Sequence, residues 1–472
     1  METNKEPLSG EIILGLVAMS LAVLVIANDF TAFSVALPAI EAEFATDITT
    51  VQWIINGYTL VFGVLIVTGG RLADMFGRRM IFFVGSAIFA GFSLLGGLAT
   101  DMWMLLLARA LMGIGGALMW PAVLGMTYAL LPGSRAALAG ALIIGIAGFG
   151  NCIGPTLGGA LTDLASWRWI FLLNLPVSAL AVLVTWRVVA RDRPDGARAR
   201  IDYAGILALS IGLFALLLSL DQGVDVGWTH PRILGLFALS AAGLAAFAII
   251  ERRTRSNALV PDDVIGNRIF VAACLATLLM SAIFFAALLY LPQFMIKQLG
   301  YSALRSGTGL LPVMGTFAFV SFLSGPLYER LGAKTVVSAG AACLAAGIWL
   351  LSRVDATTAY TQLVPGMVVL GIGIGLFYSS ITTAAITAVD PSRASLAGAI
   401  VYMCQVAGGS VGLGFNTALV ATASSLTTGI QQAFLVDANL ALCGLIVSVF
   451  YVGGRIRQGQ WHTLVHRHRA HG

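Results

Sequence analysis

Charged residues are scarce in this chain of 472 residues, because Asp, Glu, Lys and Arg together make up only 10% of it. Soluble proteins average roughly 25%. Apolar residues make up 58% and the mean hydropathy is +0.91, values that exclude a chain folded in water. Each of the five cysteines stands alone within an apolar run, so neither a metal knuckle nor a redox pair is indicated. The sequence therefore predicts an integral membrane protein.

Fourteen apolar runs are long enough to cross a bilayer, which takes about 20 residues per helix. The hydrocarbon core offers no water to unpaired backbone groups, so each run is predicted to be an α-helix. The first run is too long for the apolar part of a signal peptide, and we expect it to remain as the first helix. The expected helices span 12–37, 51–70, 80–99, 102–128, 136–161, 169–190, 203–220, 232–250, 268–292, 305–324, 335–352, 360–380, 394–421 and 434–454.

Lys and Arg are distributed unevenly over the expected loops. With the amino terminus in the cytoplasm, 21 of the 27 lie on the cytoplasmic side, five lie outside and Arg109 lies within a helix. Cytoplasmic loops carry the positive excess, so we expect both termini inside. The net charge of +5 then reflects topology and contact with anionic lipid, and no nucleic-acid partner is indicated. His462 and His466, four residues apart in the basic tail, could share a metal, but a solvated tail is favoured.

The chain contains an internal repeat. Residues 134–141 recur at 392–399 with seven of eight identical, an offset of 258. Eight expected helices separate the copies, and an even number predicts parallel repeats related by an axis along the membrane normal. The expected domains are a six-helix bundle at 1–190, linkers with two extra transmembrane helices at 191–267, a second six-helix bundle at 268–455 and a cytoplasmic tail at 456–472.

A charged segment, 70–79, lies between the second and third apolar runs with the spacing G-x-L-x-D-x-x-G-[RK]-[RK]. It resembles the loop between helices 2 and 3 in the major facilitator superfamily of secondary transporters. A weaker copy at 325–334 has Ala333 in the first basic position. The resemblance implies a gating loop at the cytoplasmic face, with a weaker gate in the second copy. The alternative is that the basic residues only fix the topology, but this would not explain the acidic residue Asp74. The gating residues are Gly70, Asp74, Gly77, Arg78, Arg79 and Glu329.

Fourteen helices with an extra central pair resemble the drug:proton antiporter branch of this superfamily over nearly the whole chain. The resemblance implies an all-α major facilitator fold of two pseudo-symmetric six-helix bundles plus an inserted helix pair. In the fifth helix, 150–159 resembles the antiporter motif, which favours an exporter, although close packing alone could produce its spaced glycines. The motif residues are Gly150, Gly154, Pro155, Gly158 and Gly159. Residues 167–176 match the same branch and are expected to anchor the sixth helix at the interface.

Asp29 and Arg109 are charged residues well inside their expected helices. Asp29 matches the acidic position of the branch's first helix, and Arg109 matches the arginine that the family ties to energy coupling, although Met112 replaces a common glutamine beside it. At 1.5 Å per residue both lie about 10–12 Å from the outer helix ends. We therefore predict a proton-coupling pair that breaks when Asp29 is protonated. The alternatives are a purely structural ion pair and an Asp29 side chain that reaches the outer interface.

Several aromatic and polar side chains could line a substrate route, because aromatic faces with one carboxylate suit lipophilic cations. Packing or contact with lipid is the alternative for each. The candidates are Trp53, Asn56, Tyr58, Phe284, Phe285, Tyr290, Tyr378, Tyr402 and Gln405. The glycines of 371–375 do not indicate a nucleotide site, because no strand precedes them and no P-loop lysine follows. Helix 305–324 has no acid, whereas members of the branch that export divalent cations carry extra membrane carboxylates; the resemblance therefore does not imply export of divalent cations.

Together these features predict a proton-coupled multidrug exporter that works by alternating access in the inner membrane of a bacterium. The alternative is a dedicated exporter of a single metabolite, antibiotic or lipid with the same fold and coupling. An enzyme or receptor is disfavoured, because no nucleophile, metal cluster or soluble domain is indicated. No cofactor or metal is expected beyond the proton gradient. The expected partners are lipophilic small molecules, protons and membrane lipids. We expect the protein to be a monomer, and the sequence leaves open whether a periplasmic adaptor binds it.

Overall fold

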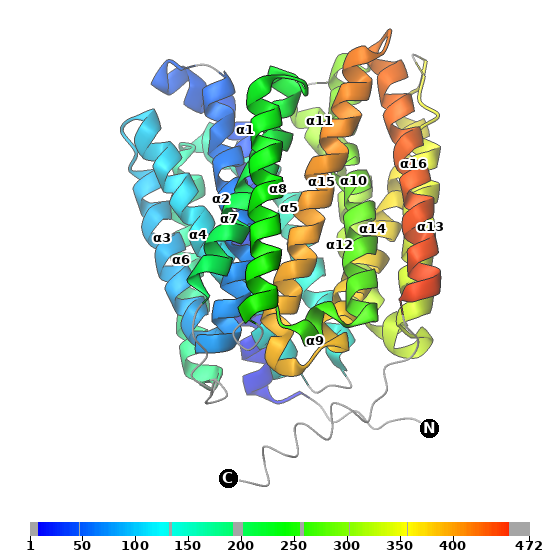
Figure 1. The fold of residues 1–472 in the computed structure, drawn as a ribbon. Coiled ribbons are helices and arrows are strands. Elements are labelled where there is room, and N and C mark those ends of the chain that lie inside the picture. The colour runs from blue at the N-terminus through cyan, green and yellow to red at the C-terminus, as the bar shows by residue number, and fades with distance from the viewer. Residues whose placement is uncertain are drawn as a thin grey trace, which may run out of the picture.

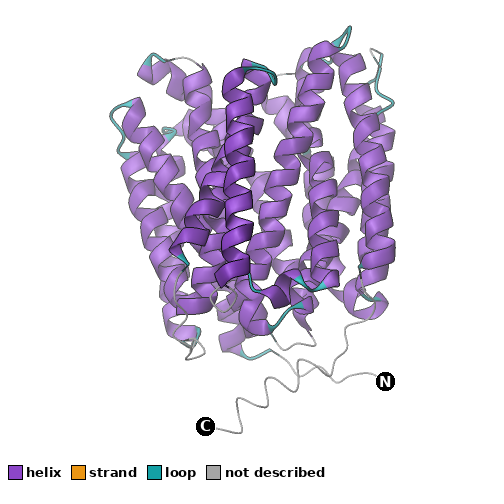
Figure 2. Cartoon of the chain, viewed as in Figure 1, coloured by secondary structure: helices purple, strands orange, loops and turns teal. Residues whose placement is uncertain are grey.

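The computed structural model describes residues 8–46, 48–131, 135–191, 202–254, 259–301, 303–355 and 357–452. Within these residues the secondary structure is helical and contains no strand (Figure 2). Fourteen helices are long and apolar enough to cross a membrane, which confirms the predicted all-α membrane class. The histidines of the basic tail lie outside the described residues.

The membrane-spanning helices stand side by side along one common direction (Figure 1). The first eight are α1 (Gly10–Phe44), α2 (Ile48–Phe76), α3 (Arg78–Gly97), α4 (Met102–Leu130), α5 (Ala136–Leu164), α6 (Arg168–Val188), α7 (Tyr203–Val226) and α8 (Pro231–Thr254). The later ones are α10 (Arg268–Lys297), α12 (Leu311–Leu331), α13 (Ala333–Leu351), α14 (Tyr360–Ala388), α15 (Ala394–Thr422) and α16 (Leu426–Tyr451). Short helices are α9 (Asp262–Ile265), α11 (Ala303–Gly309) and the 3-10 helix η3 (Pro391–Arg393).

Two expected helices differ most from the observed ones. The expected helix at 305–324 is divided into α11 and α12, with Pro312 in the first turn of α12, where a missing backbone N–H costs nothing. The expected helix at 434–454 begins earlier, at Leu426, because Ser425 caps it: its hydroxyl accepts the Thr428 backbone N–H at 3.2 Å. Its first turns contain polar residues, so hydropathy alone does not indicate them.

The expectation of a loop at 70–79 is wrong. Helix α2 continues through this segment to Phe76 and α3 begins at Arg78, so a single residue, Gly77, separates the two helices. Gly77 has φ +101°, a conformation that side chains with a Cβ rarely adopt. Gly332, with φ +85°, makes the corresponding break between α12 and α13. The gating motif is therefore the last turns of α2 and the first turn of α3.

The helices pack as two bundles with an inserted pair. In one bundle α1 packs on α5, and α4 on α2 and α3; in the other α10 packs on α15, and α14 on α12 and α13. Helices α5 and α12, and α2 and α15, join the bundles, while α7 and α8 pack on each other and α7 also contacts α2 and α15. Only 11% of the α8 span is buried, which fits a helix that faces lipid (Figure 1).

The described chain enters α1 and leaves α16 at the same side of the molecule, the lower side in Figure 1. We call this side the terminal face. The break between α2 and α3, the short helix α9 and the connection from α14 to α15 lie there. The connection from α1 to α2 lies at the opposite face. The positions of the candidate residues are described relative to these two faces.

Candidate functional site

A buried ion pair joins α1 to α4. The side chains of Asp29 and Arg109 are both 0% exposed, and Arg109 Nη1 donates to Asp29 Oδ2. The predicted pairing is therefore present, and the alternative in which Asp29 reaches the interface is wrong. The comparison of depths was only partly sound, because α1 continues to Phe44, fifteen residues beyond Asp29.

The second carboxylate oxygen of Asp29 is occupied from α6. Asn174 Nδ2 lies 3.2 Å from Asp29 Oδ1 and 3.1 Å from Ser93 Oγ, and the Ser93 hydroxyl donates to the backbone oxygen of Phe171 at 2.8 Å. Asn174 was not among the candidate residues, because the motif containing it was interpreted as an interfacial anchor. The signal that could have identified Asn174 is its polar amide side chain within an otherwise apolar helix. Helices α1, α3, α4 and α6 thus meet at one polar cluster.

Helix α2 holds the other side of the arginine. Arg109 Nε donates to the backbone oxygen of Ile54 at 2.7 Å. The guanidinium carbon lies 4.5 Å from the ring centroid of Phe33 and 4.4 Å from that of Tyr58. Two aromatic faces therefore stabilise this fully buried cation. Arg109 Nη2 has no hydrogen-bond partner among the described residues, so the guanidinium retains a free donor.

The antiporter motif fixes the turn of α1 that contains Asp29. A Cβ added at Gly154 would lie 2.0 Å from Thr31 Oγ1, and one added at Gly158 would lie 2.2 Å from the backbone oxygen of Ala32. Gly150 makes the same kind of approach to α1 one turn earlier, and Pro155 and Gly159 lie in the same helix, α5. Side chains at these glycines would push α1 away from α5. The motif therefore places the acid by close helix packing.

A second polar cluster lies at the terminal face, where the bundles touch. Asp74, near the end of α2, accepts the backbone N–H of Leu396 at 2.8 Å and that of Ser395 at 3.3 Å. Both amides belong to the first turn of α15, so Asp74 caps a helix of the other bundle. Arg78 Nε also donates to Asp74 at 3.2 Å. The positive end of the α15 dipole further favours this carboxylate.

Arg78 extends the same contact. Its Nη2 donates to the backbone oxygen of Pro391 at 2.6 Å, and its Nη1 donates to that of Gly125 at 3.1 Å. Gly70 permits the approach, because a Cβ there would lie 2.7 Å from the Cβ of Ala399. We call Gly70, Asp74 and Arg78 with their partners on α15 and η3 the clamp. The clamp closes the terminal face between the bundles.

The other motif residues lie outside the clamp. Arg79 Nη2 donates to the backbone oxygen of Trp186 at 2.7 Å, a contact within its own bundle. Glu329 of the second copy is exposed, unlike Asp74. Gly77 supplies the break between α2 and α3. Of the six expected gating residues, Gly70, Asp74 and Arg78 join the two bundles.

Some candidate substrate residues form a row of rings between the bundles. The ring centroid of Tyr402, on α15, lies 4.8 Å from that of Trp120 and 5.6 Å from that of Phe62. Phe62 in turn lies 5.9 Å from Tyr58, the ring that covers Arg109. Trp120 and Phe62 were not candidates; nothing in the sequence distinguishes them from aromatic residues that face lipid. The row connects the buried pair with the bundle interface.

The remaining candidates lie elsewhere. Phe284 contacts Phe285 and Tyr378, with ring centroids 5.4 and 6.1 Å away, inside the second bundle. The Tyr290 hydroxyl is hydrogen-bonded to Thr417. The three others, on α2 and α15, are partly buried: Trp53, Asn56 and Gln405. The structure therefore does not bring the nine candidates together into one site.

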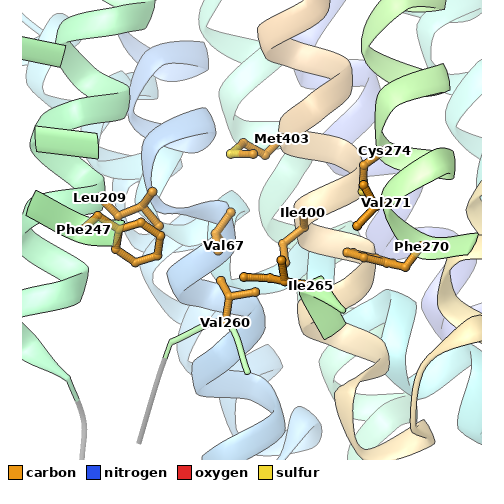
Figure 3. Close-up of a pocket in the computed structure, with 10 residues that line it drawn as sticks. All are labelled: Val67, Leu209, Phe247, Val260, Ile265, Phe270, Val271, Cys274, Ile400 and Met403. Atoms are coloured by element: carbon orange, nitrogen blue, oxygen red, sulfur yellow. The ribbon is translucent and has the colours of Figure 1, made fainter. Parts of the chain in front are cut away.

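An apolar cavity of about 250 Å³ lies beside the bundle interface. It is lined by α2 and α15, by the inserted pair α7 and α8, by α10 and by the segment around α9 (Figure 3). Met403, adjacent to Tyr402 in sequence, is among its lining side chains. The lining residues are Val67, Leu209, Phe247, Val260, Ile265, Phe270, Val271, Cys274, Ile400 and Met403.

At the opposite face an ion pair ties α1 to α6. Arg168 Nη2 lies 2.7 Å from Glu43 Oε1, and the Trp167 indole N–H donates to Glu43 at 2.7 Å. The hydrogen bond from Arg168 lowers the pKa of Glu43, helped by that from Trp167 and opposed by partial burial. Trp167 is 2% exposed, so the expected interfacial segment begins with a buried anchor. No group of three or more His, Cys, Asp or Glu side chains suited to a metal occurs in the described part of the chain.

Known proteins resemble this chain over most of its length. The Major Facilitator Superfamily model matches residues 19–413 and 273–463. Puromycin resistance protein pur8 of Streptomyces alboniger is 35% identical over 90% of this chain and 83% of its own. Multidrug transporter protein MdtP of Bacillus subtilis is 32% identical (81% and 71%), and multidrug resistance protein Stp of Mycobacterium tuberculosis is 33% identical (88% and 77%). The structure of the human organic anion transporter MFSD10 (TETRAN) shares the fold, with a TM-score of 0.66 at 14% identity over 93% of this chain and 100% of its own.

Proposed function

The chain belongs to the major facilitator superfamily of membrane transporters, and we propose that it is a proton-coupled exporter of lipophilic, often cationic compounds. The observation that carries this proposal is the Asp29–Arg109 pair, which is completely buried between α1 and α4. Removing two charges from water costs several kcal/mol per ion, and their attraction offsets this cost only while both remain charged. A proton on Asp29 cancels one charge and releases the arginine. The pair can therefore convert proton binding into movement.

Two helices can transmit that movement to the clamp. Helix α2 contacts Arg109 through Ile54 and carries Asp74 twenty residues further on, which corresponds to about 30 Å of helix. Helix α4 carries Arg109 near one end and offers the Gly125 oxygen to Arg78 near the other. When the pair separates, α2 is free to shift relative to α4 and α15. Alternating access then follows as a rigid-body movement of one bundle against the other.

The orientation of the chain places the clamp relative to the cell. We place the terminal face in the cytoplasm, with both termini, because 21 of the 27 Lys and Arg residues then lie on that side. The clamp is then a cytoplasmic gate, closed in the conformation described. The relatives whose names denote antibiotic or multidrug resistance support export from a bacterial cell. We further propose that the protein lies in the inner membrane, acts as a monomer and uses no cofactor.

The apolar cavity and the row of rings supply a route for lipophilic compounds. Such compounds concentrate in the bilayer, and the cavity is lined mostly by membrane-spanning helices, among them α2, α15 and the inserted pair, next to α9 at the terminal face. From there Tyr402, Trp120 and Phe62 offer aromatic faces on the way to Tyr58 and the buried pair. Aromatic faces bind cations and flat apolar molecules alike. This route gives a function to the inserted helices, which border the cavity.

Flux through purified protein in proteoliposomes tests the proposal. With an imposed pH gradient, ethidium should accumulate on the acidic side, and collapse of the gradient by an ionophore should abolish the accumulation. The second candidate, a dedicated exporter, shares the buried pair and the clamp; it predicts instead that the pH gradient drives flux of one metabolite and that ethidium does not move. Absence of any gradient-driven flux, with ethidium or with candidate metabolites, would contradict both.

A further inference from the structure

A second buried carboxyl lies in the other bundle. Asp437 is 0% exposed and occupies α16 (red in Figure 1), eleven residues after its first residue and fourteen before its last. At 1.5 Å per residue it lies about 17 and 21 Å from the two helix ends, so it is near the middle of the membrane-spanning segment. An acid at this depth is costly unless charge or hydrogen bonds compensate it. The surroundings of Asp437 therefore indicate whether its carboxyl group is protonated or ionised.

Asp437 has one hydrogen-bond partner among the described residues. Asn416 Nδ2, on α15, donates to Asp437 Oδ2 at 2.8 Å, and Asn416 is also 0% exposed. Asp437 Oδ1 and Asn416 Oδ1 are both buried without a partner in the described part of the chain. The pair thus contains one hydrogen bond and two unused acceptors, with no donor for either. A single additional hydrogen would correct this imbalance.

The cation that balances Asp29 in the first bundle is missing here. No ion pair of the described residues includes Asp437. On the helices packed against α16 the charged residues stand at or next to helix ends: Arg268 and Lys297 on α10 and Lys334 on α13. The other titratable groups of α16 and these helices are Cys274, Tyr290, Cys343, Tyr402, Cys404, Cys443 and Tyr451.

Tyr290, on α10, is a titratable neighbour of the acid. It interacts electrostatically with Asp437, its hydroxyl is hydrogen-bonded to Thr417 at 2.8 Å, and its ring lies 6.4 Å from that of Phe434. A neutral phenol cannot compensate a carboxylate charge. An ionised Asp437 would therefore remain uncompensated in a medium of low dielectric constant.

We propose that Asp437 is a proton-binding site, occupied in the conformation described, with Asn416 as its positioning residue. A proton on Oδ1 removes the carboxylate charge and supplies the missing donor. The hydroxyl can then donate to Asn416 Oδ1 while Asn416 Nδ2 continues to donate to Oδ2, which closes an acid–amide ring and satisfies both unused acceptors. The site goes beyond coupling at Asp29 and does not depend on it. Each bundle then has an acid that is 0% exposed within a membrane-spanning helix: Asp29, paired with an arginine, and Asp437, paired with an amide.

Infrared spectroscopy of the full chain in liposomes tests this assignment directly, because a protonated carboxyl has a carbonyl stretch that a carboxylate lacks. At neutral pH, wild-type minus Asp437→Asn spectra should contain this band, and deuterium exchange should shift it. Asn416→Leu should retain the band at a changed frequency, since the ring partner is lost. Asp29→Asn should leave it unchanged, which separates this site from the proposed coupling pair.

Two outcomes would overturn the proposal. A difference spectrum with only carboxylate bands would mean that Asp437 is ionised, and carboxylate bands that shift with Na⁺ would identify an alkali cation in place of the proton. If Asp437→Asn does not give a monodisperse protein, Asp437→Glu replaces it. The longer acid should then move the protonated-carboxyl band, and an unmoved band would assign the band to another residue and refute the site.

Discussion

Asp74 connects the two bundles through bonds that a conservative substitution can weaken without changing side-chain size. Its carboxylate accepts two first-turn amides of α15 and is paired with Arg78. A helix cap contributes about 1 kcal/mol, and a negative charge at a helix N-terminus adds about 0.3–1 kcal/mol. Asn retains one acceptor oxygen but no charge, so we expect Asp74→Asn to weaken the closed state by about 1–2 kcal/mol. This corresponds to a roughly 5- to 30-fold shift of the equilibrium between closed and open clamp.

Double electron–electron resonance can measure this shift. In a background without the five native cysteines, spin labels at Met80 on α3 and Thr335 on α13 report the separation of the bundles at the terminal face, because both side chains are exposed. Asp74→Asn should add a population at longer distance. Glu329→Gln is the matched control, since water screens an exposed carboxylate. A distance distribution that is the same in Asp74→Asn as in the parent protein would refute the clamp.

Three further substitutions test other parts of the structure. Gly154→Val should reduce transport, because even its Cβ would lie 2.0 Å from an atom of α1, whereas Gly91→Ala, with no atom within 4 Å, should not; flux in proteoliposomes measures both. Met403→Trp should slow efflux of bulky compounds more than Met403→Leu, because it fills the apolar cavity; concentration-dependent initial rates reveal the change. Arg168 lowers the pKa of Glu43, so this pair stabilises the fold above the ordinary value of 4.5 and loses its effect as the pH falls through the lowered pKa. Acidification should therefore lower the unfolding temperature of wild type more than that of Glu43→Gln; an equal loss in both would contradict this assignment.

The features that could be predicted from the sequence are those whose alternatives carry a large free-energy cost. A membrane-buried arginine requires a partner, and this requirement pairs Asp29 with Arg109 although the expected end of the first helix was seven residues too early. Apolar length gives the number of helices for the same reason. The capping of α15 by Asp74 of the other bundle could not be predicted. Its partners are the backbone amides of Ser395 and Leu396, and backbone groups leave no signal in the sequence. The clamp therefore appears only when the two bundles are seen together.

Asp437 was missed for a different reason. The expected helix at 434–454 placed this acid in the first turn, where a charged residue is unremarkable, whereas the observed helix begins at Leu426 and places it near the middle. An error of two turns at a helix end thus concealed a buried carboxyl. Asn174 was hidden in a similar way, because a motif interpreted as an interfacial anchor extends inward as far as Asp29. Both residues show that depth, which hydropathy locates poorly at helix ends, decides the role of a polar side chain.

The most direct measurement compares two modes of transport by Asp29→Asn in proteoliposomes. The first is ethidium accumulation driven by a pH gradient, and the second is exchange of labelled for unlabelled ethidium without a gradient. If Asp29 carries the coupling proton, the variant loses the first and retains the second, because the route between the bundles persists. Accumulation at the wild-type level in Asp29→Asn would show that the buried pair is only structural and would contradict the mechanism.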